Sequence, residues 1–64
     1  MAAYTRETAE RDAAAMQGWD GVHVHLAPEP AIDGTDIYYI SARDPISGRT
    51  AIWDADDQPQ ARWA

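Results

Sequence analysis

A chain of 64 residues that contains no cysteine has to fold by packing alone. It can form neither disulfides nor thiolate metal sites, and a single core of this size is close to the lower limit for independent folding. Apolar residues nevertheless make up 45% of the sequence, which is enough for a core. We therefore expect one small domain over residues 1–64, present as a monomer or a weak dimer.

The N-terminal part of the chain has the pattern of a short amphipathic helix over residues 5–17. Thr5 is a candidate N-cap, and Gly18 stands where a glycine commonly ends a helix. Three apolar residues recur at the spacing of one helix face: Ala9, Ala13 and Met16. Two pairs of opposite charge stand four residues apart on this helix: Arg6–Glu10 and Glu7–Arg11. We expect Trp19, just beyond the helix, to be at least half buried.

Three strands are predicted near residues 21–27, 36–43 and 49–54. The first alternates apolar residues with histidines, and the second is apolar on both faces, which is typical of a central strand. Proline, aspartate and glycine mark the two connections as a loop and a turn. The sequence therefore predicts an α+β fold, in which one N-terminal helix packs on a three-stranded antiparallel meander. The other face of the sheet should stay partly uncovered.

The charge of the chain restricts its partners. Eleven acidic residues stand against five arginines, giving a net charge of −6. This balance disfavours direct binding to nucleic acids or to anionic membranes, and it favours a basic partner or plain solubility. No apolar run reaches the length of about 18 residues that a membrane span needs, and the N-terminus lacks a signal-peptide pattern. We expect a cytoplasmic protein.

Most of the acidic residues should gather at one end of the sheet. In an antiparallel meander, the loop between strands 1 and 2 lies at the same end as the exit of strand 3. Six carboxylates belong to these two segments: Glu29, Asp33, Asp36, Asp54, Asp56 and Asp57. Asp20 and Glu10 are outlying members of the same set. The cluster can serve turns and solubility, or its carboxylates can stand in for phosphates.

Other chemistry has weaker support in the sequence. His23 and His25 have a spacing that metal sites use, but no third ligand is evident on the neighbouring strands. The aspartates around Gly34 lack the spacing of an EF-hand. Ser41 and Ser47 fall on a strand and in a turn, without a nucleophile motif. We expect no metal, no cofactor and no enzymatic activity.

One stretch resembles the second half of a WW domain. It comprises residues 34–40 and 48–53, with Pro59 beyond them. By this resemblance Tyr39 and Trp53 form a groove for polyproline II ligands. The alternative function is therefore a small peptide-binding or scaffolding module that uses an aromatic sheet face.

Taken as a whole, the chain resembles the small acidic anti-CRISPR proteins of phages and mobile elements, in particular inhibitors of type I-C systems. The resemblance covers size, acidity and the order of helix and sheet. It implies that the protein binds a Cas surveillance complex (Cascade) in the bacterial cytoplasm and blocks target DNA by imitating its negative charge. The acidic residues named above would then occupy a basic DNA-binding surface of the effector complex.

Overall fold

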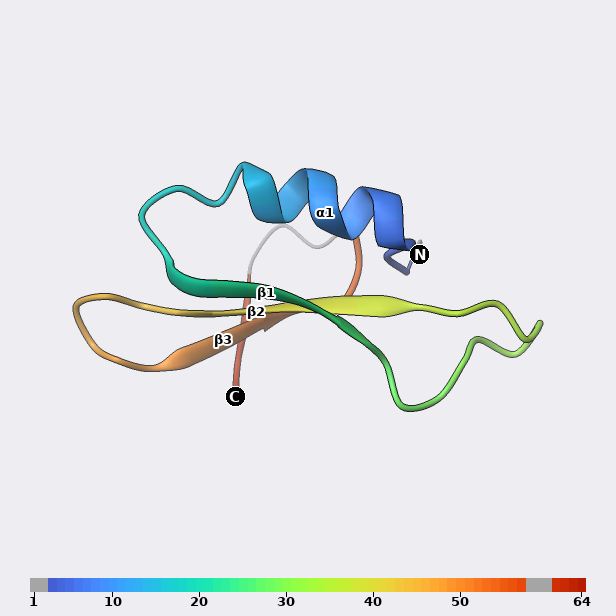
Figure 1. Ribbon diagram of the computed structural model, residues 1–64. Helices are drawn as coiled ribbons and strands as arrows, with labels where there is room; N and C mark the ends of the chain where they lie inside the picture. The colour runs from blue at the N-terminus through green and yellow to red at the C-terminus, as the bar shows by residue number, and fades with distance from the viewer. Residues whose placement is uncertain (1–2, 58–60) are drawn as a thin grey trace.

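The computed structural model describes residues 3–57 and 61–64. Its elements follow in the order α1 (Arg6–Ala14), β1 (Asp20–Leu26), β2 (Tyr38–Arg43), β3 (Thr50–Trp53) and β4 (Arg62–Trp63). The four strands form one antiparallel sheet in chain order, and α1 lies across one of its faces (Figure 1). The predicted α+β fold is confirmed, and the C-terminal tail adds a short fourth strand.

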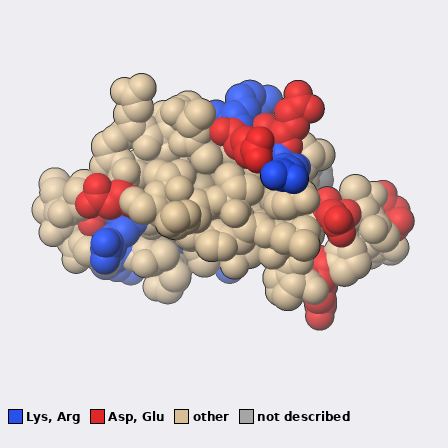
Figure 2. All heavy atoms as spheres, in the orientation of Figure 1, with Lys and Arg blue, Asp and Glu red and all other residues tan. Residues whose placement is uncertain are grey.

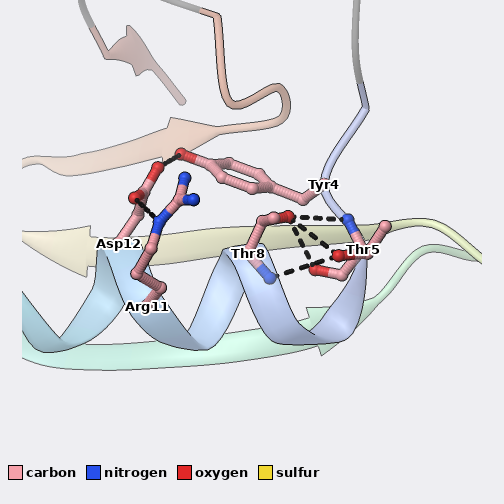
Figure 3. Close-up of polar contacts among 5 residues, drawn as sticks. All are labelled: Tyr4, Thr5, Thr8, Arg11 and Asp12. Carbon is pink, nitrogen blue, oxygen red and sulfur yellow. Dashed lines mark hydrogen bonds and ion pairs between the residues drawn. The ribbon is translucent and has the colours of Figure 1, made fainter.

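The start of α1 is fixed by a capping box. The Thr5 hydroxyl accepts the backbone N–H of Thr8 at 3.2 Å, and the Thr8 hydroxyl accepts the backbone N–H of Thr5 at 2.9 Å (Figure 3). Two otherwise unpaired helix donors are thereby satisfied. Thr5 is thus confirmed as the N-cap.

The end of α1 comes three residues before the predicted limit at residue 17. After Ala14 the chain tightens, and the N–H of Met16 reaches back only to the carbonyl of Ala13, at 3.2 Å. This tighter turn still lets Met16 pack against the core. Gly18 then adopts a φ of 89°, which turns the chain toward β1.

The core lies between α1 and the sheet and centres on Tyr4, Ala9 and Ile40, all of them buried. The predicted helix face is confirmed, since Ala13 and Met16 also pack against this cluster. Tyr4 was not predicted as a core residue. It precedes the N-cap and packs with Ala9, the pair of positions that a hydrophobic staple brings together.

Three tryptophans meet at the edge of this core. The Trp19 ring meets the Trp53 ring edge to face, with centroids 4.9 Å apart, and lies 6.1 Å from the Trp63 ring. Trp63 reaches this position because β4 pairs it with Ala51 of β3. Trp19 is half-buried, as predicted.

The helix covers only one of the two faces of the sheet. Val24 pairs with Ile40 and Ile40 with Trp53, so these residues share the face that α1 covers. The alternate residues lie on the opposite face, which we call the open face: His23, His25, Tyr39, Ser41 and Ile52. Among the described residues α1 is the only helix, and it leaves the open face uncovered. This asymmetry was predicted.

The connection between β1 and β2 is an ordered projection. Backbone hydrogen bonds join the N–H of Ala27 to the carbonyl of Ile37 and the N–H of Ala31 to the carbonyl of Thr35, each at 2.9 Å. Gly34 takes a φ of 84° at the tip, where another residue would be strained. Figure 1 shows the connection extending away from the helix and sheet. We call residues 27–37 the acidic arm.

Candidate functional site

The acidic arm carries three of the predicted carboxylates in exposed positions: Glu29, Asp33 and Asp36. Figure 2 shows acidic side chains, and no basic ones, at the end of the molecule where the arm projects. No Lys or Arg occurs anywhere between Arg11 and Arg43 in the sequence. Among the described residues, no ion pair joins these three carboxylates to a base. The arm therefore presents uncompensated negative charge.

Asp33 also shapes the arm. Its Oδ1 atom accepts the backbone N–H of Thr35 at 3.0 Å, and hydrogen bonding by Thr35 lowers the pKa of the Asp33 carboxyl. This is the usual role of aspartate in a turn. The same group therefore holds the backbone of the tip and keeps its negative charge. Beside it, Ile32 is fully exposed.

The exit of β3 contributes less free charge than predicted. Asp54 forms an ion pair of 2.9 Å with Arg62, which β4 brings back alongside β3. Asp56 contributes, after Asp12, to the raised pKa of the Arg11 guanidinium, so its charge acts on the helix. Asp57 is exposed. Asp54 thus lies close to the base of the arm, beside Ala27 and Ile37, with its charge partly compensated by Arg62, whereas Asp56 acts on the helix.

The two outlying acidic residues do not join the arm. Glu10 pairs with Arg6 on the exposed face of α1, at 3.2 Å. Asp20 begins β1 and stands opposite Arg43 in the sheet register, at the end of β1 from which the arm does not leave. Both belong to other parts of the surface.

Of the two charge pairs predicted on the helix, Arg6–Glu10 forms, whereas the prediction of a Glu7–Arg11 pair is wrong. The Nε atom of Arg11 donates to Asp12 Oδ1 at 3.0 Å instead of pairing with Glu7 (Figure 3). Asp12 is held in place by a second hydrogen bond, from the hydroxyl of Tyr4. The Arg11 guanidinium therefore pairs with the adjacent Asp12 carboxylate, which Tyr4 already holds in position.

The predicted aromatic groove does not form. Trp53 pairs with Ile40, whose neighbour Tyr39 points to the other face, so Tyr39 and Trp53 lie on opposite faces of the sheet. Trp53 packs in the core with Trp19. Tyr39 stacks on His25 instead, with ring centroids 4.8 Å apart and planes inclined by 17°. The open face therefore has an aromatic surface of different composition.

The histidines of the open face are His23 and His25, on neighbouring outward positions of β1. The rings of His23 and His25 are 6.1 Å apart, and the described residues contain no group of three potential metal ligands. His25 Nε2 and Ser41 Oγ share a hydrogen bond of 2.7 Å. No carboxylate among the described residues hydrogen-bonds to His25, so the pair lacks the orienting group of a catalytic triad.

In comparisons with known proteins, no family model, no curated protein and no solved structure matches this chain. In the described ranges, no helix has the length and apolar character needed to cross a membrane.

Proposed function

We propose that this protein is an anti-CRISPR inhibitor that places its acidic arm on a Lys/Arg-lined DNA-binding surface of a type I Cas effector complex. The observation that carries the proposal is the arm itself, an ordered projection with three exposed carboxylates in a stretch of chain without Lys or Arg. The protein would act in the cytoplasm of the bacterial host as a monomer or a weak dimer, without enzymatic activity.

Carboxylates can replace phosphates on such a surface. Arg guanidinium groups bind either group through paired, charge-assisted hydrogen bonds. The arm carboxylates need not give up an ion pair with another described residue before they bind. The backbone hydrogen bonds of the arm also reduce the entropy that binding has to remove. The net charge of −6 further accelerates the encounter with a basic surface.

The function can be tested in cells by phage plating. Bacteria with an active type I-C CRISPR system and a spacer against the phage would express the protein or a variant of it. We expect the unchanged protein to restore plaque formation, and the triple variant Glu29→Gln, Asp33→Asn, Asp36→Asn to lose this activity. Asparagine at position 33 keeps an oxygen that can accept the N–H of Thr35, so the arm should retain its shape.

A matched control separates the position of the charge from its amount. The variant Glu7→Gln, Glu10→Gln, Asp44→Asn also removes three negative charges, but from α1 and the β2–β3 turn. It should still protect the phage. If the unchanged protein leaves CRISPR immunity intact in type I-C and the other type I systems, the proposed function is wrong.

A further inference from the structure

A hollow of about 270 Å³ opens on the open face, at the end of the sheet from which the acidic arm leaves. It is lined by apolar and aromatic residues and by one ion pair: Ala27, Pro28, Ile37, Tyr38, Tyr39, Ile52, Asp54 and Arg62. We call it the open-face groove. Most of this lining is apolar, and Tyr39 and Ile52 are only half-buried. The sheet thus leaves an apolar site that α1, on the other face, cannot fill.

The size of the groove suits a side chain better than a small molecule. Sites for drug-sized ligands and cofactors commonly enclose about 300–1,000 Å³ and bury most of the ligand. The open-face groove, at about 270 Å³, is just below that range, and it lies open on a sheet surface. An anchor residue from a protein partner is the occupant that this geometry favours.

The charge around the groove selects the neighbours of that anchor. Ala27 and Pro28 form one wall and are also the first residues of the acidic arm, so Glu29 follows directly. Asp54 lies on the opposite side with its partner Arg62. A second copy of this chain, which has the same net charge of −6, would be repelled by the arm beside the groove. A segment that carries Arg or Lys would complement Glu29 and the other carboxylates of the arm.

We propose, on the basis of the function inferred above, that the open-face groove anchors an apolar or aromatic side chain of the partner that is flanked by Arg or Lys. The apolar side chain packs on Ile52 and Tyr39, and a flanking base reaches the exposed Glu29. A purely acidic surface attracts every basic protein. The groove adds a contact that only a protein with the right anchor can make, and therefore gives specificity.

Three blocked pentapeptides test the proposal without a known partner. Their central residues are Arg-Trp-Arg, Arg-Gly-Arg and Glu-Trp-Glu, each between terminal glycines. Each is titrated into the isotope-labelled full chain at low salt, and amide chemical shifts are followed by NMR. We expect the Arg-Trp-Arg peptide to shift the amides of Ile37, Tyr39 and Ile52, and to bind about tenfold more tightly than the other two.

Two variants locate the site. Ile52→Thr keeps a β-branched residue in β3 but removes apolar surface from the groove. It should therefore lower the affinity for the Arg-Trp-Arg peptide about fivefold. Thr50→Ser, on the same strand and face but outside the groove, should leave the affinity unchanged. The amide spectrum of each variant reports whether the fold is intact. If Ile52→Thr does not fold, Pro28→Ser on the groove wall replaces it with the same expected loss.

Each other outcome overturns the inference in a recognisable way. Equal binding of the Arg-Gly-Arg peptide would mean that charge alone attracts the ligand, which leaves the proposed function standing. Equal binding of the Glu-Trp-Glu peptide would mean that the groove does not select a basic segment. Shifts confined to α1, or no shifts with any peptide, would remove the groove as a site. Phage plating would still decide the proposed function.

Discussion

The hydroxyl group of Tyr4 donates a hydrogen bond of 2.9 Å to Asp12 Oδ2 (Figure 3). The ring of Tyr4 is buried against Ala9 and Ile40, and its backbone carbonyl accepts the N–H of Tyr38 at 3.0 Å. Tyr4, which precedes the N-cap of the helix, therefore contacts α1 through its side chain and β2 through its backbone. Tyr4 joins the two layers of the fold.

Replacing Tyr4 by Phe should measure the worth of its hydroxyl group. The variant keeps the ring but removes the hydrogen bond to Asp12, so the free energy of unfolding should fall by about 1–2 kcal/mol. Tyr4→Ala, which also removes the buried ring, should cost about 3–5 kcal/mol. Urea unfolding followed by tryptophan fluorescence gives both values. An unchanged midpoint for Tyr4→Phe would show that the hydrogen bond contributes nothing.

The same residue should make the protein sensitive to alkaline pH. Burial, and then the hydrogen bond to Asp12, raise the pKa of Tyr4 well above its ordinary value of 10.0. A raised pKa in the folded state means that the stabilisation is complete below the unfolded pKa and is lost as the pH rises above it. The stability of the unchanged protein should therefore fall above pH 10.0 more steeply than that of Tyr4→Phe.

Tyrosinate absorbance provides the control for this pH effect. As long as both proteins stay folded, the unchanged protein and Tyr4→Phe should develop the same tyrosinate signal, because Tyr4 remains protonated. An additional tyrosinate in the unchanged protein before it unfolds would contradict the assigned environment of Tyr4.

Local patterns in the sequence were sufficient for most of the fold. The spacing of Ala9, Ala13 and Met16 defined the buried face of α1, because a helix repeats every 3.6 residues. Alternation in residues 37–42 placed Ile40 and Tyr39 on opposite faces of β2. The antiparallel order then fixed the end of the sheet from which the acidic arm leaves.

Contacts between segments that are distant in the sequence could not be predicted from these local patterns. Which residues of β2 and β3 share a face depends on their register, and the pairing of Ile40 with Trp53 separates Trp53 from Tyr39. The compensation of Asp54 by Arg62 requires β4, which has only two residues and no periodicity to reveal it. Tyr4 lies outside every periodic segment. The position before an N-cap, where hydrophobic staples occur, was the one signal that could have identified it.

The exposure of the arm tip can be tested by measuring how substitutions change the free energy of unfolding. Ile32 is fully exposed and Ile40 is fully buried. Ile32→Ser should change the free energy of unfolding by less than about 0.5 kcal/mol, whereas Ile40→Ala should cost about 2–5 kcal/mol. Urea unfolding of both variants compares them. A large loss for Ile32→Ser would mean that the arm folds back on the body of the protein and does not project.

The position of negative charge should matter more than its amount. Asp54 is already neutralised in part by Arg62, and Asp56 acts on Arg11. The variant Asp54→Asn, Asp56→Asn, Asp57→Asn should therefore weaken partner binding less than the arm variant Glu29→Gln, Asp33→Asn, Asp36→Asn. The affinity of both variants for purified Cascade can be compared by biolayer interferometry. Equal losses would contradict the distinction between the arm and the β3 exit.

Competition with target DNA for purified type I-C Cascade tests the central claim most directly. Fluorescence anisotropy of a labelled target duplex gives the concentration of the protein that displaces half of the DNA. The arm variant should raise this concentration at least about tenfold, because interfacial charge pairs contribute roughly 1–3 kcal/mol each. The matched variant Glu7→Gln, Glu10→Gln, Asp44→Asn should change it by less than about threefold. Failure of the unchanged protein to displace DNA, or equal effects of the two variants, would contradict the assignment of the acidic arm as a phosphate mimic.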